Sequence, residues 1–390
     1  MNSTAIISYA RTPIGKYLGS LSSISAPKLC SEAIKETLNR ASLPQELVPE
    51  AAFIGNVLSA GIGQAPARQA ILGAKLPSST ICTTVNKVCA SGMKSVIFGT
   101  QSIQLNEYEI VLAGGMESMS NVPHYLPKSR TGIRLGHGKI IDGVIHDGLW
   151  DVYNNQHMGH CAEKCAVDYN ISRHDQDGYA TMSYIRARRA YNAGILSKEI
   201  VPIQFKTKKS SSTAAIIDKD EELDSIDVEK IVMVKPAFQN DEDGTVTAAN
   251  ASSLNDGAAA MLLMNEELAM SLDLKPIARI LSYADAEQDP VEFTTTPSLA
   301  ITKALQKAGL TLNDVDYFEI NEAFSVVALA NAQILDIDID KCNVFGGAVA
   351  LGHPIGMSGT RIIGTLCNVL QENDGNIGVA SVCNGGGGAR

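Results

Sequence analysis

An internal repeat limits the folds open to this chain more than any other feature of its sequence. Seven small or apolar residues in the first 50 positions recur with a constant separation of 267 positions. The helical spacing of both sets, each followed by a short apolar segment at 52–54 or 317–320, predicts a helix that leads into a buried strand. The matched residues are Ser31, Ala33, Ile34, Leu38, Ala41, Leu43 and Val48 in the first copy and Ser298, Ala300, Ile301, Leu305, Ala308, Leu310 and Val315 in the second.

Two further matches lengthen the repeat. Within two positions of the same separation, 97–100 pairs with 362–365 and 110–113 pairs with 377–380. Alternating helix and strand signals in each copy favour two similar α/β halves whose strand ends meet. We therefore predict an N-terminal half over 1–118, completed by about 251–270, and a C-terminal half over 271–390.

The segment 119–250 has no counterpart in the repeat and is richer in Gly, Asn, Asp, His and Lys. It is predicted to form an inserted loop domain that acts as a lid. Within it the composition of 161–193 predicts a helix, while 210–227 is expected to be a polar, charged loop.

Composition excludes several classes of protein. At 390 residues the chain exceeds the size at which a single hydrophobic core keeps growing, so we expect two related cores or one core with a large insertion. A net charge of −10 argues against a nucleic-acid surface, and no apolar stretch is long enough to predict a membrane span. Eight irregularly spaced cysteines favour reduced thiols inside a cell. Since no leader is visible, we expect a cytoplasmic location, with the mitochondrial matrix after removal of a leader as the alternative.

Cys89 is the first candidate nucleophile. It follows a strand-like run at 81–85 and precedes a long helical segment that reaches Gln104. The partial positive charge of a helix N-terminus is expected to lower the thiol pKa from its ordinary value of about 8.5. The alternative is a small cysteine buried in the core.

His353 lies in a glycine-rich segment, 346–359, directly before a predicted helix. So many glycines suggest that the backbone approaches a ligand or another chain segment closely. A histidine near Cys89 would accept the thiol proton, as nucleophilic catalysis by cysteine requires. The alternative is a turn histidine that only makes structural hydrogen bonds.

Cys383 ends a predicted strand and is followed by four glycines at 385–388. By the repeat it matches Met116, which lies beside Gly114 and Gly115. Consecutive glycines leave N–H groups free to point at an oxyanion, although a flexible tail is the simpler interpretation. Asn321 and Glu322 follow another strand, 316–320, where active sites form in α/β folds.

Taken together, these blocks resemble the four signature motifs of the thiolase family, in the family's order and spacing. They are the segment around Cys89, Asn321-Glu322-Ala323-Phe324, Gly352-His353-Pro354 with Gly356 and Gly359, and Cys383 with its glycines. The resemblance covers residues 11–388, includes 55–58, 63–69 and 244–252, and is strongest to the eukaryotic, potassium-dependent acetyl-CoA C-acetyltransferases. It implies two βαβαβαββ halves packed as a layered α/β/α/β/α core.

The resemblance also implies roles for the site residues. Cys89 would carry the acetyl group, and His353 would activate it. His353 and a water held by Asn321 would form the oxyanion hole for the thioester enolate. Cys383 would move a proton to and from the acetyl methyl group. The N–H groups of Cys89 and Gly385 would form the second oxyanion hole.

For the substrate, the resemblance implies a coenzyme A tunnel and a monovalent cation site. The coenzyme A positions are Leu149, His157, Met158, Phe238, Ala248, Ser252, Phe293 and Ala323, and the K+ positions are Tyr184, Ala248, Ala249, Ala251 and Val349. We infer that Lys206, Lys208 and Lys209 help to bind the coenzyme A phosphates, the alternative being a solvated loop. His157, Cys161 and Cys165 have helical spacing but make a poor zinc site, so no catalytic metal is predicted.

Three smaller expectations follow from the same resemblance. The aromatic Phe293 leaves acceptance of 2-methylacetoacetyl-CoA open. The basic loop with Lys128, Arg130, Arg134 and Lys139 predicts a homotetramer, its alternative being an ordinary exposed loop. Family chains usually continue with a final strand after the glycines, so a chain that stops at Arg390 is either truncated or lacks an edge strand.

The function implied is reversible condensation of two acetyl-CoA to acetoacetyl-CoA and CoA by ping-pong kinetics, as the first step of mevalonate synthesis. Breakdown of ketone bodies and isoleucine is the alternative. Three other readings compete: a condensing enzyme that pairs Cys with two His or with His and Asn, a Cys/His/Asn hydrolase, and a silent acyl-CoA carrier. Cys383, as a second thiol, argues against the first two, and the intact motifs argue against the third.

Overall fold

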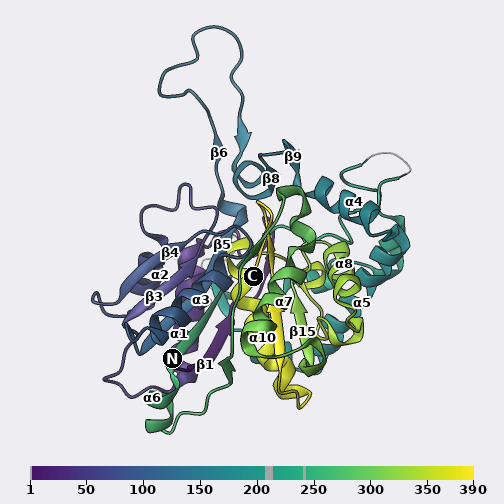
Figure 1. Ribbon diagram of the computed structural model, residues 1–390. Helices are drawn as coiled ribbons and strands as arrows, with labels where there is room; N and C mark the ends of the chain where they lie inside the picture. Colours follow the sequence, from purple (N-terminus) through teal and green to yellow (C-terminus); the bar gives the residue numbers. More distant parts are fainter. Residues whose placement is uncertain (1, 207–213, 240–242) are drawn as a thin grey trace.

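The computed structural model describes residues 2–206, 214–239 and 243–390. In Figure 1 the N-terminal half lies on the left and the C-terminal half on the right, with the insert above and behind the second half. No helix in these described ranges is long and apolar enough to cross a membrane.

The N-terminal half is built on a seven-stranded sheet in the order β13-β1-β12-β5-β3-β4, with β2 beside β12. Strand β3 is parallel to β4 and β5, whereas β12 is antiparallel to β1 and β5. The strands are β1 (Thr4–Arg11), β2 (Gly15–Lys16), β3 (Ala51–Gly55), β4 (Ile81–Val85), β5 (Ile110–Ser118), β12 (Asn255–Asn265) and β13 (Ala278–Ile280).

Strand β12 shows why this sheet needs helices on both faces. All its residues are buried, and successive side chains enter two different apolar clusters. Ala260 and Leu262 pack with helices α1 and α2, while Met261 and Leu263 pack with α3 and α10. This alternation follows from the two-residue period of a strand. The helices are α1 (Ala26–Ala41), α2 (Pro66–Gly73), α3 (Ser91–Gln104) and α10 (Ile355–Glu372); α6 (Glu266–Ser271) follows β12.

The C-terminal half contains a parallel pair, β15 with β16, and a small sheet in the order β14-β18-β17. Its apolar cluster joins α7, α8 and β15 to the insert helix α4. The elements are β14 (Ala286–Glu287), α7 (Thr296–Ala308), β15 (Tyr317–Ile320), α8 (Ser325–Leu335), α9 (Ala348–Leu351), β16 (Gly378–Ser381), β17 (Cys383–Asn384) and β18 (Gly388–Ala389).

The predicted repeat is present in the fold. Helix α1 leads to β3 as α7 leads to β15, and α3 leads to β5 as α10 leads to β16. The halves differ beside β16, where the edge away from β15 faces an apolar groove of about 530 Å³. Residues 277–284 form the opposite wall of this groove.

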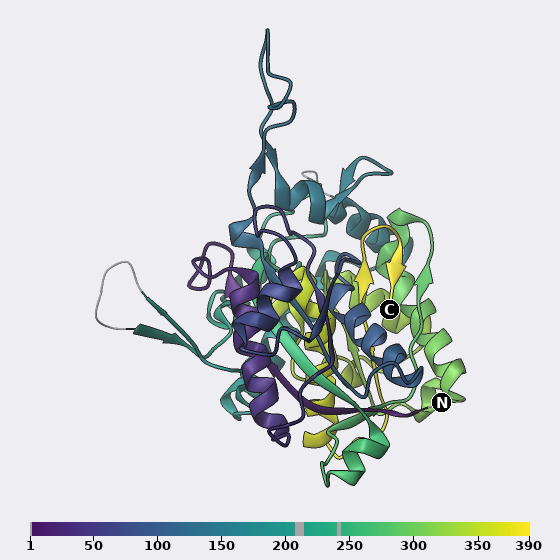
Figure 2. The ribbon, with the colours of Figure 1, turned by 90° about the vertical axis from the view of Figure 1, so that its left-hand side faces the viewer.

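The insert differs from the sequence prediction in two places. The segment 161–193 forms two helices, α4 (Met158–Asp168) and α5 (Arg173–Asn192), because Ser172 and Asp175 make a capping box that starts α5. The expected loop at 210–227 is wrong in part, since its apolar residues Ala214–Ile217 form β11, which pairs with β10 (Ile203–Lys206). This hairpin projects from the body in Figure 2.

Two other hairpins complete the insert. Strands β6 (His124–Tyr125) and β7 (Ile141–Asp142) flank the long loop at the top of Figure 1. Strands β8 (Trp150–Asp151) and β9 (Gln156–His157) lead into α4. A buried ion triad fixes the insert to the first half: Arg11 on β1 contacts Glu199 at 2.8 Å and Asp220 at 2.7 Å. Since buried charges need partners, loss of either acid would leave Arg11 with only one of its two buried carboxylates.

Candidate active site

The site lies where the two repeat-equivalent helices α3 and α10 meet at their first turns. Glycines allow this contact: a Cβ on Gly92 would lie 2.9 Å from the carbonyl oxygen of Gly356, and one on Gly359 would lie 2.3 Å from the nitrogen of Met93. Cys89 and His353 each stand two residues ahead of their helix. Packing of the two helix starts therefore brings together residues that are 264 positions apart in the sequence.

Cys89 sits on a strained turn after β4. Val88 adopts φ = +48°, a left-handed conformation that is a genuine outlier for a β-branched residue. Neighbouring side chains hold the turn: the Val88 N–H donates to Asn86 Oδ1 at 3.0 Å, and Ser91 Oγ donates to the Val88 carbonyl at 2.6 Å. The turn leaves Cys89 partly exposed beside the start of α3.

The expectation of a lowered Cys89 pKa is wrong. Burial raises the pKa of this thiol to about 11, although N–H groups of Gly385 and of Cys89 itself act in the opposite direction. Desolvation thus outweighs the helix terminus, because removing water penalises the thiolate more than the nearby dipoles stabilise it. A thiol with this pKa needs a base to become a nucleophile at neutral pH.

His353 is buried, with 5% of its surface exposed. The backbone N–H of His353 donates to Asn255 Oδ1 at 2.8 Å. On the ring, Nδ1 lies 2.5 Å from Oγ of Ser358, which is in the first turn of α10. Burial, and then the charge of Arg361, lower the pKa of His353 to about 3. The ring is therefore neutral at physiological pH and able to accept a proton.

Asn321 follows β15 and faces His353. Its Nδ2 lies 3.4 Å from Nε2 of His353, so Ser358 and Asn321 contact opposite nitrogens of the ring. The Oδ1 atom of Asn321 is buried and makes no hydrogen bond within the described part of the chain. Such an atom is available to a water or a ligand.

Cys383 comes from the far end of the chain and is fully buried. Burial raises its pKa well above the ordinary value, and the charges of Cys89 and Cys165 raise it further. The two thiols are thus electrostatically coupled. The glycines that follow form a packed turn between β17 and β18 and are no flexible tail: a Cβ on Gly387 would lie 2.1 Å from the Gln288 carbonyl oxygen. The Gly385 N–H donates to the Cys89 thiol.

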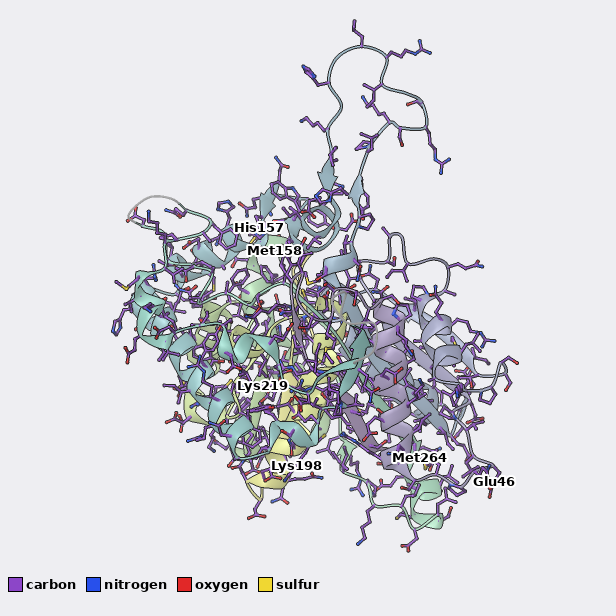
Figure 3. The ribbon with its side chains drawn as sticks, turned by 180° about the vertical axis from the view of Figure 1, so that it is seen from behind. Glu46, His157, Met158, Lys198, Lys219 and Met264 are labelled. Carbon is purple, nitrogen blue, oxygen red and sulfur yellow. The ribbon has the colours of Figure 1, made fainter. Side chains whose placement is uncertain are left out.

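Most of the predicted coenzyme A positions form one wall beside these thiols. The His157 ring stacks on Phe238 with centroids 4.8 Å apart, and Met158 lies next to Gly385. Figure 3 shows His157 and Met158 side by side below the protruding loop. Met158, Phe293, Ala323 and Cys383 share an apolar cluster, against which Phe238 packs.

The other coenzyme A positions are placed as follows. Ser252 Oγ donates to the Ala323 carbonyl at 2.9 Å, so these two residues adjoin. Leu149 packs on the apolar cluster that Cys89 also contacts. Ala248 is exposed. Lys208 and Lys209 lie outside the described residues, as does the side chain of Lys206. The base of this hairpin packs against α1 through Ile203 and Ile217, and it does not join the apolar cluster that contains Met158.

The predicted K+ positions are only partly gathered. Tyr184, Ala249 and Val349 share one apolar cluster, whereas Ala251 pairs with Phe324 in another and Ala248 is exposed. Among the described residues, no three His, Cys, Asp or Glu side chains are grouped to hold a metal ion.

Two buried carboxylates organise the site: sequence reasoning named Glu322 without giving it a role and missed Glu117. Glu322, inside the Asn321 motif, accepts from Tyr179, Ser183 and the Val349 N–H at 2.8, 2.8 and 3.0 Å. Glu117, at the end of β5, accepts from four N–H groups. An acidic residue two positions after Gly114-Gly115 was the one available signal for Glu117.

Comparison with known proteins agrees with this geometry. Residues 4–267 match the family model "Thiolase, N-terminal domain", and residues 274–390 match "Thiolase, C-terminal domain". The chain is 56% identical to "Acetyl-CoA acetyltransferase 1" of Arabidopsis thaliana, covering 98% of this chain and 92% of the relative. It is 52% identical to "Acetyl-CoA acetyltransferase ERG10, cytosolic" of Gibberella zeae, covering 98% of this chain and 96% of that one.

A solved structure extends the agreement to three dimensions. A thiolase from Ascaris suum in complex with coenzyme A superposes with a TM-score of 0.93 at 44% identity, covering 99% of this chain and 98% of that one. The predicted fold class is confirmed, as is the family predicted from the motifs. The chain belongs to the thiolase family of acyltransferases.

Proposed function

We propose that the protein is an acetyl-CoA C-acetyltransferase, which converts two acetyl-CoA to acetoacetyl-CoA and CoA and also catalyses the reverse reaction. The observation that carries the proposal is the placement of two neighbouring thiols, the partly exposed Cys89 and the buried Cys383, beside a neutral histidine. The names of the relatives from Arabidopsis thaliana and Gibberella zeae support the same activity. A hydrolase or a silent carrier gives no reason for a second thiol.

In the first half-reaction Cys89 Sγ attacks the thioester carbonyl of acetyl-CoA. His353 takes the Cys89 proton and Cys383 gives its own proton to the departing sulfur, so acetyl-Cys89 forms, CoA leaves as a thiol and Cys383 is left as the thiolate. A base is needed because the pKa of Cys89 is about 11. The N–H groups of Cys89 and Gly385 stabilise the oxyanion of the tetrahedral intermediate.

In the second half-reaction Cys383, as the thiolate, removes a proton from the methyl group of a second acetyl-CoA. The resulting carbanion attacks acetyl-Cys89, acetoacetyl-CoA forms, and the Cys89 thiolate departs and regains its proton from His353, while Cys383 keeps the methyl proton. His353 and a water on Asn321 Oδ1 stabilise the enolate oxygen, a role supported by that atom's burial without a partner within the described chain. A raised Cys383 pKa makes its thiolate a strong base.

Coenzyme A binds along the wall formed by His157, Met158 and Phe238 and reaches the thiols past Gly385. Close contact between Met158 and Gly385 supports this path. Phe293 belongs to the same apolar cluster, and only 2% of its surface is exposed. Acceptance of 2-methylacetoacetyl-CoA depends on the space beside it and is tested by direct assay of that substrate.

A potassium ion is proposed as an activator, held by Tyr184 and by the backbone around Ala248, Ala249, Ala251 and Val349. The grouping of three of these residues near Glu322 supports a cation there. Bound K+ would supply a local positive charge that holds these loops in place, and it would take no part in the reaction itself. Equal activity and equal thermal midpoints in K+ and Na+ buffers would remove this part of the proposal.

The biological setting is also a proposal: cytoplasmic, supplying the first step of mevalonate synthesis, with ketone-body and isoleucine breakdown as the second candidate. The Gibberella zeae relative is named as a cytosolic enzyme, which supports the cytoplasm. Fractionation of the source cells decides the compartment, and recovery in the mitochondrial matrix would favour the second candidate.

A homotetramer is proposed, joined through the protruding loop with Lys128, Arg130, Arg134 and Lys139. Its neighbouring side chains support a contact surface, since Leu135 and Ile140 are 99% and 72% exposed. Replacing Leu135 and Ile140 by Ser is expected to give dimers in light scattering. If the variant with both changes still forms a tetramer, the loop is not the contact that joins the dimers.

The activity itself is tested by thiolysis of acetoacetyl-CoA with CoA, measured for the wild type, Cys89→Ala and Cys383→Ala. Loss of acetyl-CoA formation by about 10²–10⁴-fold is expected in both variants, because each lacks a group that moves a proton or carries the acyl chain. Normal turnover in Cys383→Ala would sink the two-thiol mechanism. An inactive wild type would sink the activity.

A further inference from the structure

Glu117 stands at the end of β5, outside the residues that the reaction uses. Its side chain is fully buried, and each carboxylate oxygen accepts two N–H groups. Oε1 accepts from Asn56 Nδ2 at 2.8 Å and the Leu58 N–H at 3.1 Å, and Oε2 accepts from the Val57 and Gly356 N–H groups at 3.1 and 3.0 Å. One carboxylate thus links two chain segments 300 positions apart.

The bond to Gly356 caps α10, the helix that begins two residues after His353. The first N–H groups of a helix have no partner inside it, and the N-cap residue here, Pro354, makes no side-chain cap bond. Glu117 supplies the missing acceptor from another strand. Burial raises the pKa of Glu117 to about 7, while the N–H groups of Val57, Leu58 and Gly356 act in the opposite direction. In its ionised form the carboxylate suits the positive end of the helix. The capped residue is three positions after His353.

The surrounding packing leaves Gly356 little freedom. A Cβ on Gly356 would lie 2.5 Å from the Met116 carbonyl oxygen, and one on Gly115 would lie 2.0 Å from the Gly356 carbonyl oxygen. Backbone from β5 therefore touches the first turn of α10 directly. Glu117 fixes the direction of that turn, because it accepts the Gly356 N–H at 3.0 Å.

The second segment bound by Glu117 forms the opposite wall of the site. Val57 and Leu58 belong to an apolar cluster with Ile355, and Cys89 packs against this cluster. Both the nucleophile and the turn with His353 therefore rest on backbone that the same carboxylate orients. No other described side chain bonds to both segments.

We propose that Glu117 is a positioning residue that sets the relative placement of His353 and Cys89 for proton transfer. This inference rests on the proposed function, since it concerns the same thiol and the same base. Glu117 acts through Gly356 and the 56–58 segment without touching the substrate. A displacement of about 1 Å between reacting groups can lower a rate about 100-fold.

The test compares Glu117→Gln and Glu117→Asp with the wild type. Gln keeps the size but turns one acceptor oxygen into an NH₂ donor that faces N–H groups, and Asp keeps the charge but is too short to reach both segments. Each variant is expected to show a fall in kcat for acetoacetyl-CoA thiolysis of about 100-fold with KM changed by less than about twofold. The alkylation rate of Cys89 by iodoacetamide at pH 8 is expected to fall in parallel.

Asp256→Asn is the matched control. Asp256 is also a buried carboxylate, one strand away on β12, and it bonds Ser118 and Ser120 but no residue of α10. This variant is expected to keep wild-type kcat, even where its thermal midpoint falls. Equal losses of kcat in Asp256→Asn and Glu117→Gln would reduce Glu117 to a structural role and overturn the inference.

The outcomes separate the inference from the proposed function. Wild-type kcat and alkylation rate in a folded Glu117→Gln or Glu117→Asp protein would overturn the inference alone, and either variant suffices if the other fails to fold. Absence of thiolysis in the wild type would overturn the proposed function, while the alkylation rates would still report whether Glu117 positions the two groups.

Discussion

The two halves repeat the same helices and strands, yet their sheets are unequal. In the N-terminal half β12 lies between β1 and β5, so β5 has a partner on each side. In the C-terminal half the equivalent strand, β16, pairs with β15, and its other edge faces an apolar groove of about 530 Å³.

This difference shows which contacts the site depends on. Cys89 and His353 are gathered by the starts of α3 and α10, and Asn321 and Cys383 follow the neighbouring strand ends. None of these positions lies on the groove. Sheet completeness therefore governs the stability of the second half, whereas the close helix contact governs the chemistry.

The largest expected effect comes from opening the helix contact. Gly359→Ala places a Cβ 2.3 Å from the Met93 nitrogen, which α3 cannot avoid without moving. We expect a loss of about 3 kcal/mol in the free energy of unfolding, measured by urea denaturation, and loss of thiolysis.

Gly178→Ala in α5 is the control, because a Cβ there would have nothing within 4 Å. It is expected to gain about 0.5–1 kcal/mol from the better helix propensity of alanine. If Gly359→Ala were as stable and active as Gly178→Ala, the two helices would not need to touch.

A smaller effect is expected from Ser358→Ala, which removes the contact to His353 Nδ1. An unpaired buried nitrogen costs about 1–3 kcal/mol, so we expect kcat for thiolysis to fall about 10–100-fold. Ser95→Ala is matched to it on α3, since Ser95 Oγ donates to the Ser91 carbonyl one turn earlier, as Ser358 Oγ does to Pro354. Equal kcat values for the two variants would show that Ser358 does not orient the ring.

The two thiols should also differ in their pH dependence. With a pKa of about 11, the Cys89 thiolate fraction rises about tenfold for each pH unit between 7 and 10. Its alkylation by iodoacetamide, followed by peptide mass spectrometry, should rise by the same factor, and Cys383 should react more slowly at every pH because it is fully buried. A plateau of the Cys89 rate near pH 8.5 would contradict the raised pKa.

The smallest expected effect concerns the sheets. Amide hydrogens of β16 should exchange at least about tenfold faster than those of β5, because a strand paired on one side opens more easily. Hydrogen–deuterium exchange resolved to single residues measures this difference. Equal protection would mean that the edge of β16 is covered in solution.

Much of the fold could be predicted from the sequence. The repeat predicted both helix–strand pairs, and the segment 317–320 is β15 as expected. The loop expected at 210–227 is wrong in part, because its polar composition concealed the apolar strand Ala214–Ile217. Predictions from composition average over a window, and four apolar residues within a polar segment are lost in that average, although their partner strand Ile203–Lys206 lies close by in the sequence.

The sequence by itself determined the family, the two-half architecture and the chemical groups available, because periodicity, glycine runs and motif order are local properties of a chain. Only the tertiary structure decided the protonation states and the hydrogen-bond partners of those groups. Burial raised the pKa of Cys89 against the expectation from its helix terminus and kept His353 neutral. It also made Glu117 the shared acceptor of two distant segments. Desolvation and long-range hydrogen bonds depend on which segments meet, and that is settled only when the chain folds.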